Sequence, residues 1–243
     1  MVKSKSLPFC FKQFAVAQDE CAMKVNTDAV LLGAWADVNG AKRILDIGTG
    51  TGIIALIVAQ KSNRDRNVLP CIDAIDIDKS AFLQAKGNFE RSKWSNRLNA
   101  IHSSLQDFVA EKKYDIIISN PPYFIDDFKS KNTKKNIAKH SVTLTYETLL
   151  SCTNNLLTQI GKFFLVVPFF NYSVVEFLAA QNGLFVAKLV TVIAVQGKVP
   201  YLCLIQFQRR QYEIVRDSIV IQTELGGFTT DYKQVTKEFY LKF

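Results

Sequence analysis

Short apolar runs alternate with segments typical of helices along most of the chain. The apolar runs predict buried strands at 43–47, 71–77, 99–102, 114–119 and 162–167. The segments between and after them predict helices at 53–60, 79–91, 145–158 and 171–182. Two β-rich runs follow, at 184–195 and 200–208. Apolar strands separated by helices are typical of a parallel sheet with helices on both faces.

The last two β-rich runs are joined by only a short loop, QGKVP, so they are expected to pair antiparallel. The whole pattern resembles the class I methyltransferase fold, a Rossmann-like α/β fold whose seven-stranded, mostly parallel sheet ends in an antiparallel hairpin. We expect this domain at 41–243, with a short tail from about 210, and an N-terminal extension at 1–40 that contributes to the site. An open sheet of this kind binds ligands beyond the carboxyl ends of its strands.

A glycine-rich loop follows the first predicted strand, in the segment LDIGTGTG at 45–52. Glycine lets the backbone turn sharply and approach a ligand closely. The spacing is G-x-G-x-G, and Ile53 stands where a dinucleotide loop has its third glycine. A Walker phosphate loop is excluded because no G-K-[ST] follows. Asp46, just before the first glycine, suits a cationic ligand better than a pyrophosphate.

A pair of carboxylates ends the second predicted strand. Asp76 is placed to accept hydrogen bonds from both hydroxyls of a ribose, whereas Asp78 is expected to cap the next helix. Loop and acid together resemble the S-adenosylmethionine site of methyltransferases. That resemblance implies Asp46 near the methionine amino group and Asp76 on the ribose, with the loop contributing Gly48, Thr49, Gly50 and Gly52.

In many such enzymes an acid after the third strand also holds the cofactor adenine. Here the segment at 103–107 reads SSLQD, so that acid is either Asp107 or absent, and Ser104 stands where it is expected.

The segment Asn120-Pro121-Pro122-Tyr123 directly follows the fourth predicted strand. It resembles the (D/N)-P-P-(Y/F) motif of methyltransferases that act on planar, conjugated amino groups such as adenine N6. The lone pair of such an amine is delocalised, so the nitrogen is a poor nucleophile. The Asn120 side-chain oxygen and the Pro121 carbonyl can each accept one N–H, which drives the nitrogen toward tetrahedral geometry.

In this interpretation Pro122 helps to fix the backbone, and Tyr123 offers a ring on which a flipped base stacks. The alternative is that the four residues form only a rigid turn. Its position after an apolar strand, downstream of the glycine loop and Asp76, favours the catalytic interpretation.

Positive charge gathers after this motif. The chain carries a formal charge of +8 and has a pI of about 9.2, which favours polyanionic partners. Four lysines in an acid-free run are predicted to contact phosphates: Lys129, Lys131, Lys134 and Lys135. The alternative is a solvated loop without a ligand.

Upstream, residues 18–35 read QDECAMKVNTDAVLLGAW, which resembles a signature of the bacterial tRNA(Val) adenine-N6 methyltransferases. The segments at 224–232 and 239–241 also resemble that family, so the likeness spans nearly the whole chain. It implies methyl transfer from S-adenosylmethionine to N6 of an adenine in tRNA, adenine 37 of tRNA(Val). It also implies that Lys24, Asn26, Thr27 and Asp28 line the cofactor pocket. Alternatively, Thr27 or Asp28 caps a helix that starts at Ala29.

Other function classes fit the sequence less well. Five scattered cysteines and two histidines predict reduced thiols and no metal site, and no run of apolar residues is long enough for a membrane span. We therefore expect a cytoplasmic protein, and a monomer. A nicotinamide-dependent oxidoreductase would not explain residues 120–123, and a glutamine methyltransferase usually carries a further helical domain. Methylation of ribosomal RNA or DNA, and a non-catalytic RNA-binding role, stay open.

Overall fold

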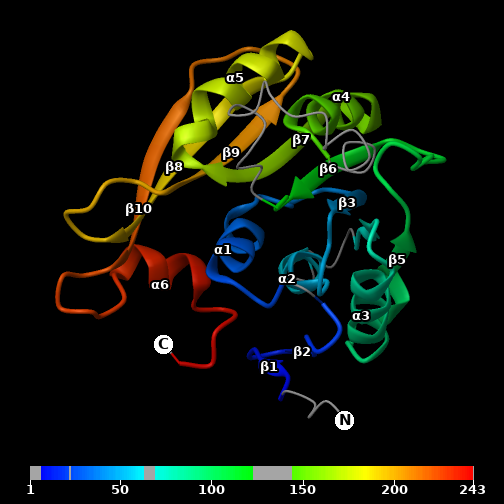
Figure 1. Cartoon of the computed structure of the whole chain (residues 1–243), viewed down its shortest axis with the longest axis horizontal. Helices are drawn as coiled ribbons and strands as arrows, with labels where there is room; N and C mark the ends of the chain where they lie inside the picture. Colours follow the sequence, from blue (N-terminus) through cyan, green and yellow to red (C-terminus); the bar gives the residue numbers. More distant parts are fainter. Residues whose placement is uncertain (1–6, 22, 63–68, 123–143, 243) are drawn as a thin grey trace, which may run out of the picture.

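The computed structural model describes residues 7–21, 23–62, 69–122 and 144–242. Its centre is an eight-stranded sheet in the order β10-β8-β9-β7-β6-β3-β4-β5 (Figure 1). The strands of this sheet are β3 (Arg43–Ile47), β4 (Cys71–Asp76), β5 (Leu98–His102), β6 (Tyr114–Ser119), β7 (Leu157–Pro168), β8 (Phe185–Val195), β9 (Leu202–Gln208) and β10 (Val215–Gln222). Strands β3 to β7 pair in parallel, and β9 runs antiparallel to both β7 and β8. The predicted antiparallel hairpin is confirmed.

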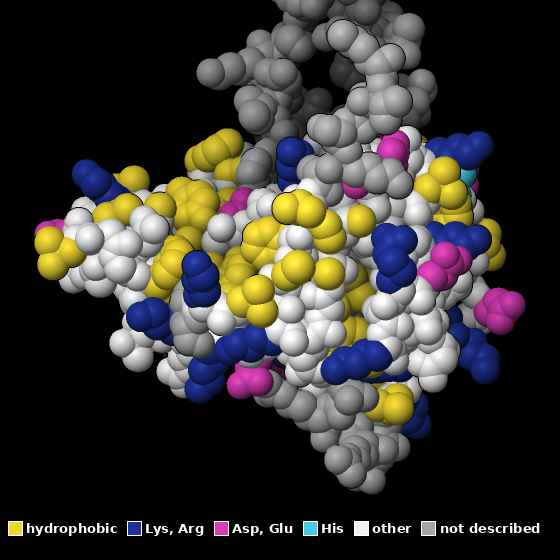
Figure 2. All heavy atoms as spheres, turned by 90° about the horizontal axis from the view of Figure 1, so that it is seen from below, with side chains coloured by type: hydrophobic (Ala, Val, Ile, Leu, Met, Phe, Trp, Pro, Cys, Tyr) yellow, Lys and Arg dark blue, Asp and Glu magenta, His cyan; other side chains and the backbone are white. Residues whose placement is uncertain are grey.

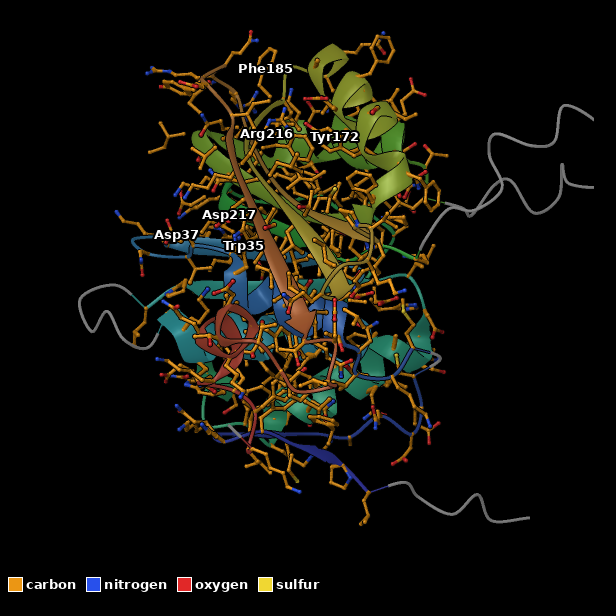
Figure 3. All side chains as sticks on the ribbon, turned by 90° about the vertical axis from the view of Figure 1, so that its left-hand side faces the viewer. Trp35, Asp37, Tyr172, Phe185, Arg216 and Asp217 are labelled. Carbon is orange, nitrogen blue, oxygen red and sulfur yellow. The ribbon has the colours of Figure 1, made fainter. Side chains whose placement is uncertain are left out.

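The expected count of seven strands is wrong, because β10 adds an eighth, parallel to β8. From its sequence, this segment was assigned to the tail. In the structure its first four residues are exposed and only Ile219 and Ile221 are buried, so it lacks the near-continuous apolar run of the central strands. Figure 3 views the molecule from this edge and shows Arg216 and Asp217 on the strand. Charged side chains on an edge strand oppose pairing with another chain.

Helices cover both faces of the sheet. The helices are α1 (Thr27–Trp35), α2 (Ile53–Ser62), α3 (Lys79–Glu90), α4 (Tyr146–Leu156), α5 (Tyr172–Gln181) and α6 (Thr230–Thr236), with 3₁₀ turns at Ser95–Arg97 and Phe169–Asn171. Helix α1 packs against α2 and α6, whereas α4 and α5 pack together and against β7 and β8. Neighbouring residues of β3 alternate between two core clusters, with Ile44 in one and Leu45 in the other. The sheet is therefore buried on both faces, as its apolar strands predict.

The two ends of the described chain lie together (Figure 1). A short antiparallel pair, β1 (Phe9–Cys10) and β2 (Ala15–Val16), precedes α1. The backbone N–H of Lys12 donates to the carbonyl of Phe239 at 2.8 Å. The ring of Phe11 stacks on that of Tyr240, with centroids 5.8 Å apart. Sequence pattern alone did not predict this contact.

Most predicted boundaries agree with the structure to within two residues, and the start of β7 differs by five. Helix α4 ends at Leu156 and β7 begins at once at Leu157, whereas the pattern predicted a helix to 158 and a strand from 162. The early part of β7 contains exposed Gln159 and Ile160, so it lacks the apolar run that marks the rest of the strand.

The cap of α1 also differs from the expectation. Asn26 caps this helix, with its Oδ1 accepting the N–H of Ala29 at 2.8 Å, so a cap from Thr27 or Asp28 is wrong. The predicted Asp78 cap on α3 is confirmed, because its carboxylate accepts the N–H groups of Ser80 and Ala81. Within the described ranges, no helix is both long and apolar enough to cross a bilayer.

Candidate active site

A cavity of about 570 Å³ lies at the carboxyl ends of β3, β4 and β6. Its size falls within the roughly 300–1,000 Å³ of small-molecule sites. The lining combines the glycine loop, the end of β4, the segment after β5, the residues after β6 and part of the segment before α1. The sheet thus brings five distant segments to the place where an open α/β sheet binds its ligand.

The glycine loop turns tightly over the end of β4. The N–H groups of Gly48 and Thr49 both donate to the carbonyl of Ile75, at 2.9 and 3.0 Å. Gly48 has φ +69° and lines the cavity, and a Cβ built on it would meet nothing within 4 Å. Gly52 has φ +82°, and a Cβ there would lie 2.5 Å from Cε1 of Phe89. The first glycine therefore opens the backbone to the cavity, while the last lets the loop pack against α3.

Asp46 lies beneath this loop. It is 1% exposed, and its Oδ2 accepts the hydroxyl of Thr49 at 2.6 Å. Its Oδ1 is buried and has no hydrogen-bond partner among the described residues. The pKa of Asp46 is raised to about 7, mainly by burial. The negative charge of nearby Asp76 acts in the same direction, and the hydrogen bond from the Thr49 hydroxyl acts in the opposite direction. Asp46 is not part of the described cavity lining, so its contact with a cofactor ammonium stays a prediction.

Asp76 stands at the cavity wall with both oxygens oriented by the backbone. Its Oδ2 accepts the N–H of Gly50 at 2.8 Å and its Oδ1 accepts the N–H of Asp78 at 2.9 Å. Each carboxylate oxygen has a second lone pair, which is available to a ligand hydroxyl. Burial raises the pKa of Asp76, and the two backbone donors act in the opposite direction.

Asn120 enters the same cavity from the end of β6. The preceding Ser119 is fully buried and donates its hydroxyl to the carbonyl of Ile47 at 3.0 Å, which ties β6 to β3. Asn120 is 8% exposed and lines the cavity together with Pro122, and Pro121 is buried between them. The structure thus brings Asn120 and Asp76 into one cavity. Tyr123, Lys129, Lys131, Lys134 and Lys135 lie outside the described residues.

Ser104 and Asp107 are joined beside the cavity. The hydroxyl of Ser104 donates to Oδ2 of Asp107 at 2.6 Å, and the N–H of Asp107 donates back to that hydroxyl at 3.1 Å. Ser104 lines the cavity, whereas Asp107 is exposed next to it. The contact of Asp107 with a cofactor stays a prediction.

Comparison with known proteins adds the identity of the fold and family. The family model described as "methyltransferase small domain" matches residues 21–173. A tRNA1(Val) (adenine(37)-N6)-methyltransferase from Dyadobacter fermentans is 43% identical over 242 residues, covering 97% of this chain and 98% of the relative. One from Bacteroides thetaiotaomicron is 40% identical and covers 96% and 97%. The chain belongs to the tRNA1(Val) (adenine(37)-N6)-methyltransferase family.

Solved structures support the fold of this methyltransferase family. A predicted O-methyltransferase from Agrobacterium tumefaciens superposes with a TM-score of 0.65 at 14% identity, covering 87% of this chain and 96% of that chain. The T. thermophilus 16S rRNA N2 G1207 methyltransferase, solved with AdoMet and guanosine, superposes with a TM-score of 0.57 at 19% identity, covering 86% and 52%. The predicted class I methyltransferase fold is confirmed.

Four residues were expected in the cofactor pocket from the resemblance to the tRNA(Val) adenine-N6 methyltransferases, and none of them is in the described cavity lining. Lys24 is exposed, and Asn26 and Thr27 line a second cavity, near the N-terminal strands. Oδ1 of Asp28 accepts the hydroxyl of Tyr201 at 3.3 Å. Their contact with a cofactor stays a prediction.

The cavity also contains residues that sequence reasoning missed in this methyltransferase. Cys21 and Met23 line it from the segment before α1, and Leu144 lines it from just before α4. A Cβ on Gly50 would lie 3.7 Å from Sγ of Cys21, so this thiol lies against the loop. Cys21 and Met23 fall inside the signature segment at 18–35, which was the available signal. Among the residues that the structure describes, no group of three or more His, Cys, Asp or Glu could hold a metal ion.

Proposed function

We propose that this protein transfers a methyl group from S-adenosylmethionine to N6 of an adenine in tRNA. The observation that carries the proposal is the position of Asn120 in the same cavity as Asp76 and the glycine loop. The relatives are named for adenine 37 of tRNA1(Val), and we propose the same target here. We also propose that the protein acts in the cytoplasm, where tRNA is modified.

The residues of the cavity fit S-adenosylmethionine. Asp76 would hold the ribose hydroxyls, because its two oxygens are oriented by backbone N–H groups and keep free lone pairs. The open backbone at Gly48 would let the methionine part approach. Ile77, Ala81 and Leu105 give an apolar wall for the adenine, with Ser104 and Asp107 near its amine. When bound, this cofactor supplies an electrophilic methyl group on a sulfonium sulfur.

Asn120 and Pro121 would prepare the amine for attack. The side-chain oxygen of Asn120 and the carbonyl of Pro121 each accept one of the two N–H groups of the adenine amine. Because Asn120 is 8% exposed, water competes weakly for these hydrogen bonds. The nitrogen lone pair would then point toward the electrophilic methyl group, so positioning provides much of the rate enhancement. The extra proton leaves the nitrogen after the new N–C bond has formed.

The segment before α1 supports a role for the N-terminal extension in this site. Cys21 and Met23 contribute to the cavity wall, and we propose that residues 1–40 help to shape the site of the methyltransferase domain at 41–243. Pro122 at the cavity edge would contact the target base, with Tyr123 stacking on it. We propose that Lys129, Lys131, Lys134 and Lys135 contact RNA phosphates.

The test is methyl transfer from labelled S-adenosylmethionine to total tRNA, total ribosomal RNA, DNA and a protein extract, followed by mass spectrometry of the digested products. N6-methyladenosine from the tRNA fraction supports the proposal. Label in another polymer would keep the chemistry and exclude tRNA as the substrate. No label in any fraction, with intact cofactor binding, would favour the non-catalytic RNA-binding role.

Asn120→Ala tests the mechanism. We expect kcat to fall by roughly 100-fold or more, as when one oriented hydrogen-bonding group is removed from an active site. The Kd for S-adenosylmethionine should stay within about twofold, because Asp76 and the glycine loop are unchanged. Asn155→Ala is the matched control, since Asn155 is exposed on α4. Near-normal turnover in Asn120→Ala would contradict the mechanism.

A further inference from the structure

A second cavity, of about 470 Å³, lies where the two ends of the described chain meet. Its walls come from β1, from the segment leading into α1, and from residues 228–242. We call it the aromatic groove, after the rings of Phe9, Phe228, Tyr232 and Tyr240 that line it. Parts of the segments at 18–35 and 224–232, which resemble one family in sequence, therefore meet here.

The rings of the aromatic groove form a connected set. Phe228 stacks on Tyr232, with centroids 5.3 Å apart and an interplanar angle of 28°. Tyr240 lies 6.4 Å from Tyr232 and 6.3 Å from Phe9, measured between centroids. Tyr232 is 2% exposed and supports the others from below, whereas Phe228 is 41% and Phe9 37% exposed. The groove therefore has a buried base and solvent-facing ring surface at its walls.

A tight turn presents Phe228. Residues 223–227 close a loop in which the N–H of Thr223 donates to the carbonyl of Gly227 at 2.7 Å, and Gly226 adopts φ +86°. Phe228 then pairs with Gln222 of β10 in an antiparallel bridge. The ring is thus fixed by the edge of the sheet and by its stacking on α6. An exposed ring held in this way offers a preformed stacking surface.

The aromatic groove adjoins the catalytic cavity. Met23 lines the cavity and Val25 lines the groove. Two residues of extended chain span at most about 7 Å. The walls of the two sites are therefore continuous along residues 23–25, so one RNA strand could extend from the cavity to the groove.

Cations border the groove, and one carboxylate, that of Asp28, also acts on it. The pKa of both tyrosines of the groove is raised mainly by burial, and the negative charge of Asp28 acts in the same direction. Lys242 lines the groove, and no Asp or Glu is among its described lining residues. Nζ of Lys12 donates to the carbonyl of Lys237 at 2.6 Å, which places another cation next to the C-terminal segment. Figure 2 shows the molecule from below the view of Figure 1, and on this face apolar side chains gather in the middle, with Lys and Arg side chains and some Asp and Glu side chains around them. Aromatic faces bordered by cations are the usual means of binding single-stranded nucleic acid.

We propose that the aromatic groove binds an unpaired base of the RNA substrate, next to the adenine that enters the catalytic cavity. The base stacks on Phe228, and its phosphate lies near Lys242. This inference rests on the proposed function and extends it, because it assigns the nucleotide beside the target to a second site. Stacking tolerates any base, so the groove contributes affinity and position rather than sequence selection.

The experiment uses an RNA stem–loop with the anticodon-loop sequence, carrying fluorescent 2-aminopurine on either side of the target adenine. Stacking on an aromatic ring quenches this base, so the wild-type protein should quench one of the two probes. Phe228→Leu keeps apolar packing on Tyr232 but removes the stacking face. We expect it to abolish the quenching and to raise the Kd for the stem–loop about 10-fold, with the Kd for S-adenosylmethionine unchanged.

Two further variants separate stacking from general effects. Phe228→Trp restores an aromatic face and should restore quenching and affinity. Phe177→Leu removes another exposed ring, 61% exposed on α5, and should change neither. Unchanged quenching in Phe228→Leu, or an equal loss in Phe177→Leu, would overturn the proposal. So would a wild-type dimer that Phe228→Leu dissociates, because a second copy would then occupy the groove.

The two proposals fail in different ways. If the protein methylates tRNA but quenches neither probe, the groove assignment is wrong and the proposed function stands. If it quenches a probe in a Phe228-dependent manner but methylates no tRNA, the groove assignment stands and the proposed function is wrong.

Discussion

Asp46, Asp76 and Asn120 stand at the ends of three neighbouring strands, yet their surroundings differ. Asp46 is enclosed beneath the glycine loop, Asp76 is held by two backbone N–H groups, and Asn120 lies at the edge of the cavity. A carboxylate that the backbone orients keeps lone pairs for ligand hydroxyls, and an enclosed one also makes the stability of the protein depend on its protonation. Equivalent positions in the sheet therefore give these side chains different electrostatic surroundings.

The enclosed Asp46 predicts a pH dependence of stability. Its pKa is about 7 in the folded protein, against about 3.9 for an unfolded chain. Between these values the folded protein keeps a proton that the unfolded chain has released, so the free energy of unfolding falls as pH rises through this window. Asp46→Asn removes the charge. Urea denaturation should show this variant gaining about 2–4 kcal/mol relative to wild type between pH 4.5 and pH 8.

Thr49→Val is the companion variant for this prediction. In the wild type the Thr49 hydroxyl donates to Oδ2 of Asp46 and thereby lowers the pKa of this carboxyl group, and the variant lacks that hydroxyl. The pKa of Asp46 should then rise further, and the loss of stability should extend to higher pH. A wild-type stability profile that is flat from pH 4.5 to pH 8 and matches that of Asp46→Asn would contradict both expectations.

At the residue scale, the sequence identified the groups whose chemistry is specific. A glycine loop, an acid and an Asn-Pro-Pro segment after successive strands point to one ligand chemistry, and the structure places Gly48, Asp76 and Asn120 in one cavity. Cys21 and Met23 could not be found in this way. Their side chains have no comparable chemical requirement, and only tertiary folding brings them to the cavity wall.

At the scale of elements, the strands that are buried on both faces were the most predictable. The predicted strands at 43–47 and 114–119 have the bounds of β3 and β6, because both are near-continuous apolar runs. Strand β10 was missed because it has an edge position and exposed charges at Arg216 and Asp217. The pairing of β1 and β2, only two residues each, depends on contacts with the C-terminal segment that no local pattern reveals.

Three alanine substitutions separate the conformational cost of the loop between β3 and α2 from its function: two in the loop, at Gly48 and Gly52, and one before β3, at Gly40. Gly40, Gly48 and Gly52 all have positive φ, but a Cβ would meet open space at the first two and Phe89 at the third. Gly40→Ala and Gly48→Ala should each cost about 1–2 kcal/mol of stability. Gly52→Ala should cost roughly 3–4 kcal/mol, because overpacking adds to the strain.

Cofactor binding distinguishes Gly40→Ala from Gly48→Ala, which are expected to lose the same stability. Gly48 lines the cavity, so Gly48→Ala should weaken S-adenosylmethionine binding by at least about 10-fold, the effect of one lost or blocked contact of 1.4 kcal/mol. Gly40→Ala should bind as wild type does. Thermal unfolding and a cofactor titration measure both quantities. Equal cofactor affinity in the two variants would contradict the assignment of the loop to the cofactor.

At the scale of the whole molecule, the fold brings its two sequence ends to one face beside the catalytic edge of the sheet. The N-terminal segment supplies Cys21 and Met23 to the cavity and Val25 to the aromatic groove, and the C-terminal segment closes the groove. If the two proposals hold, both ends of the chain contribute substrate-binding surface around the central sheet. Composition predicted a polyanionic partner, but the position of the binding surface depends on this long-range arrangement.

The formal charge of +8 raises the question of whether RNA binding depends on total charge or on its position. Replacing Lys134 and Lys135 with Ala should weaken RNA binding and reduce the slope of log K against log salt by about 1.4, or 0.7 for each lost phosphate contact on a single strand. The matched control replaces Lys112 and Lys113, an exposed pair just before β6. This pair lies at the amino ends of the parallel strands, whereas the cavity lies at their carboxyl ends. Both double variants lower the net charge by the same amount. If position decides, only the first pair changes the slope, whereas equal changes would assign RNA binding to the overall charge.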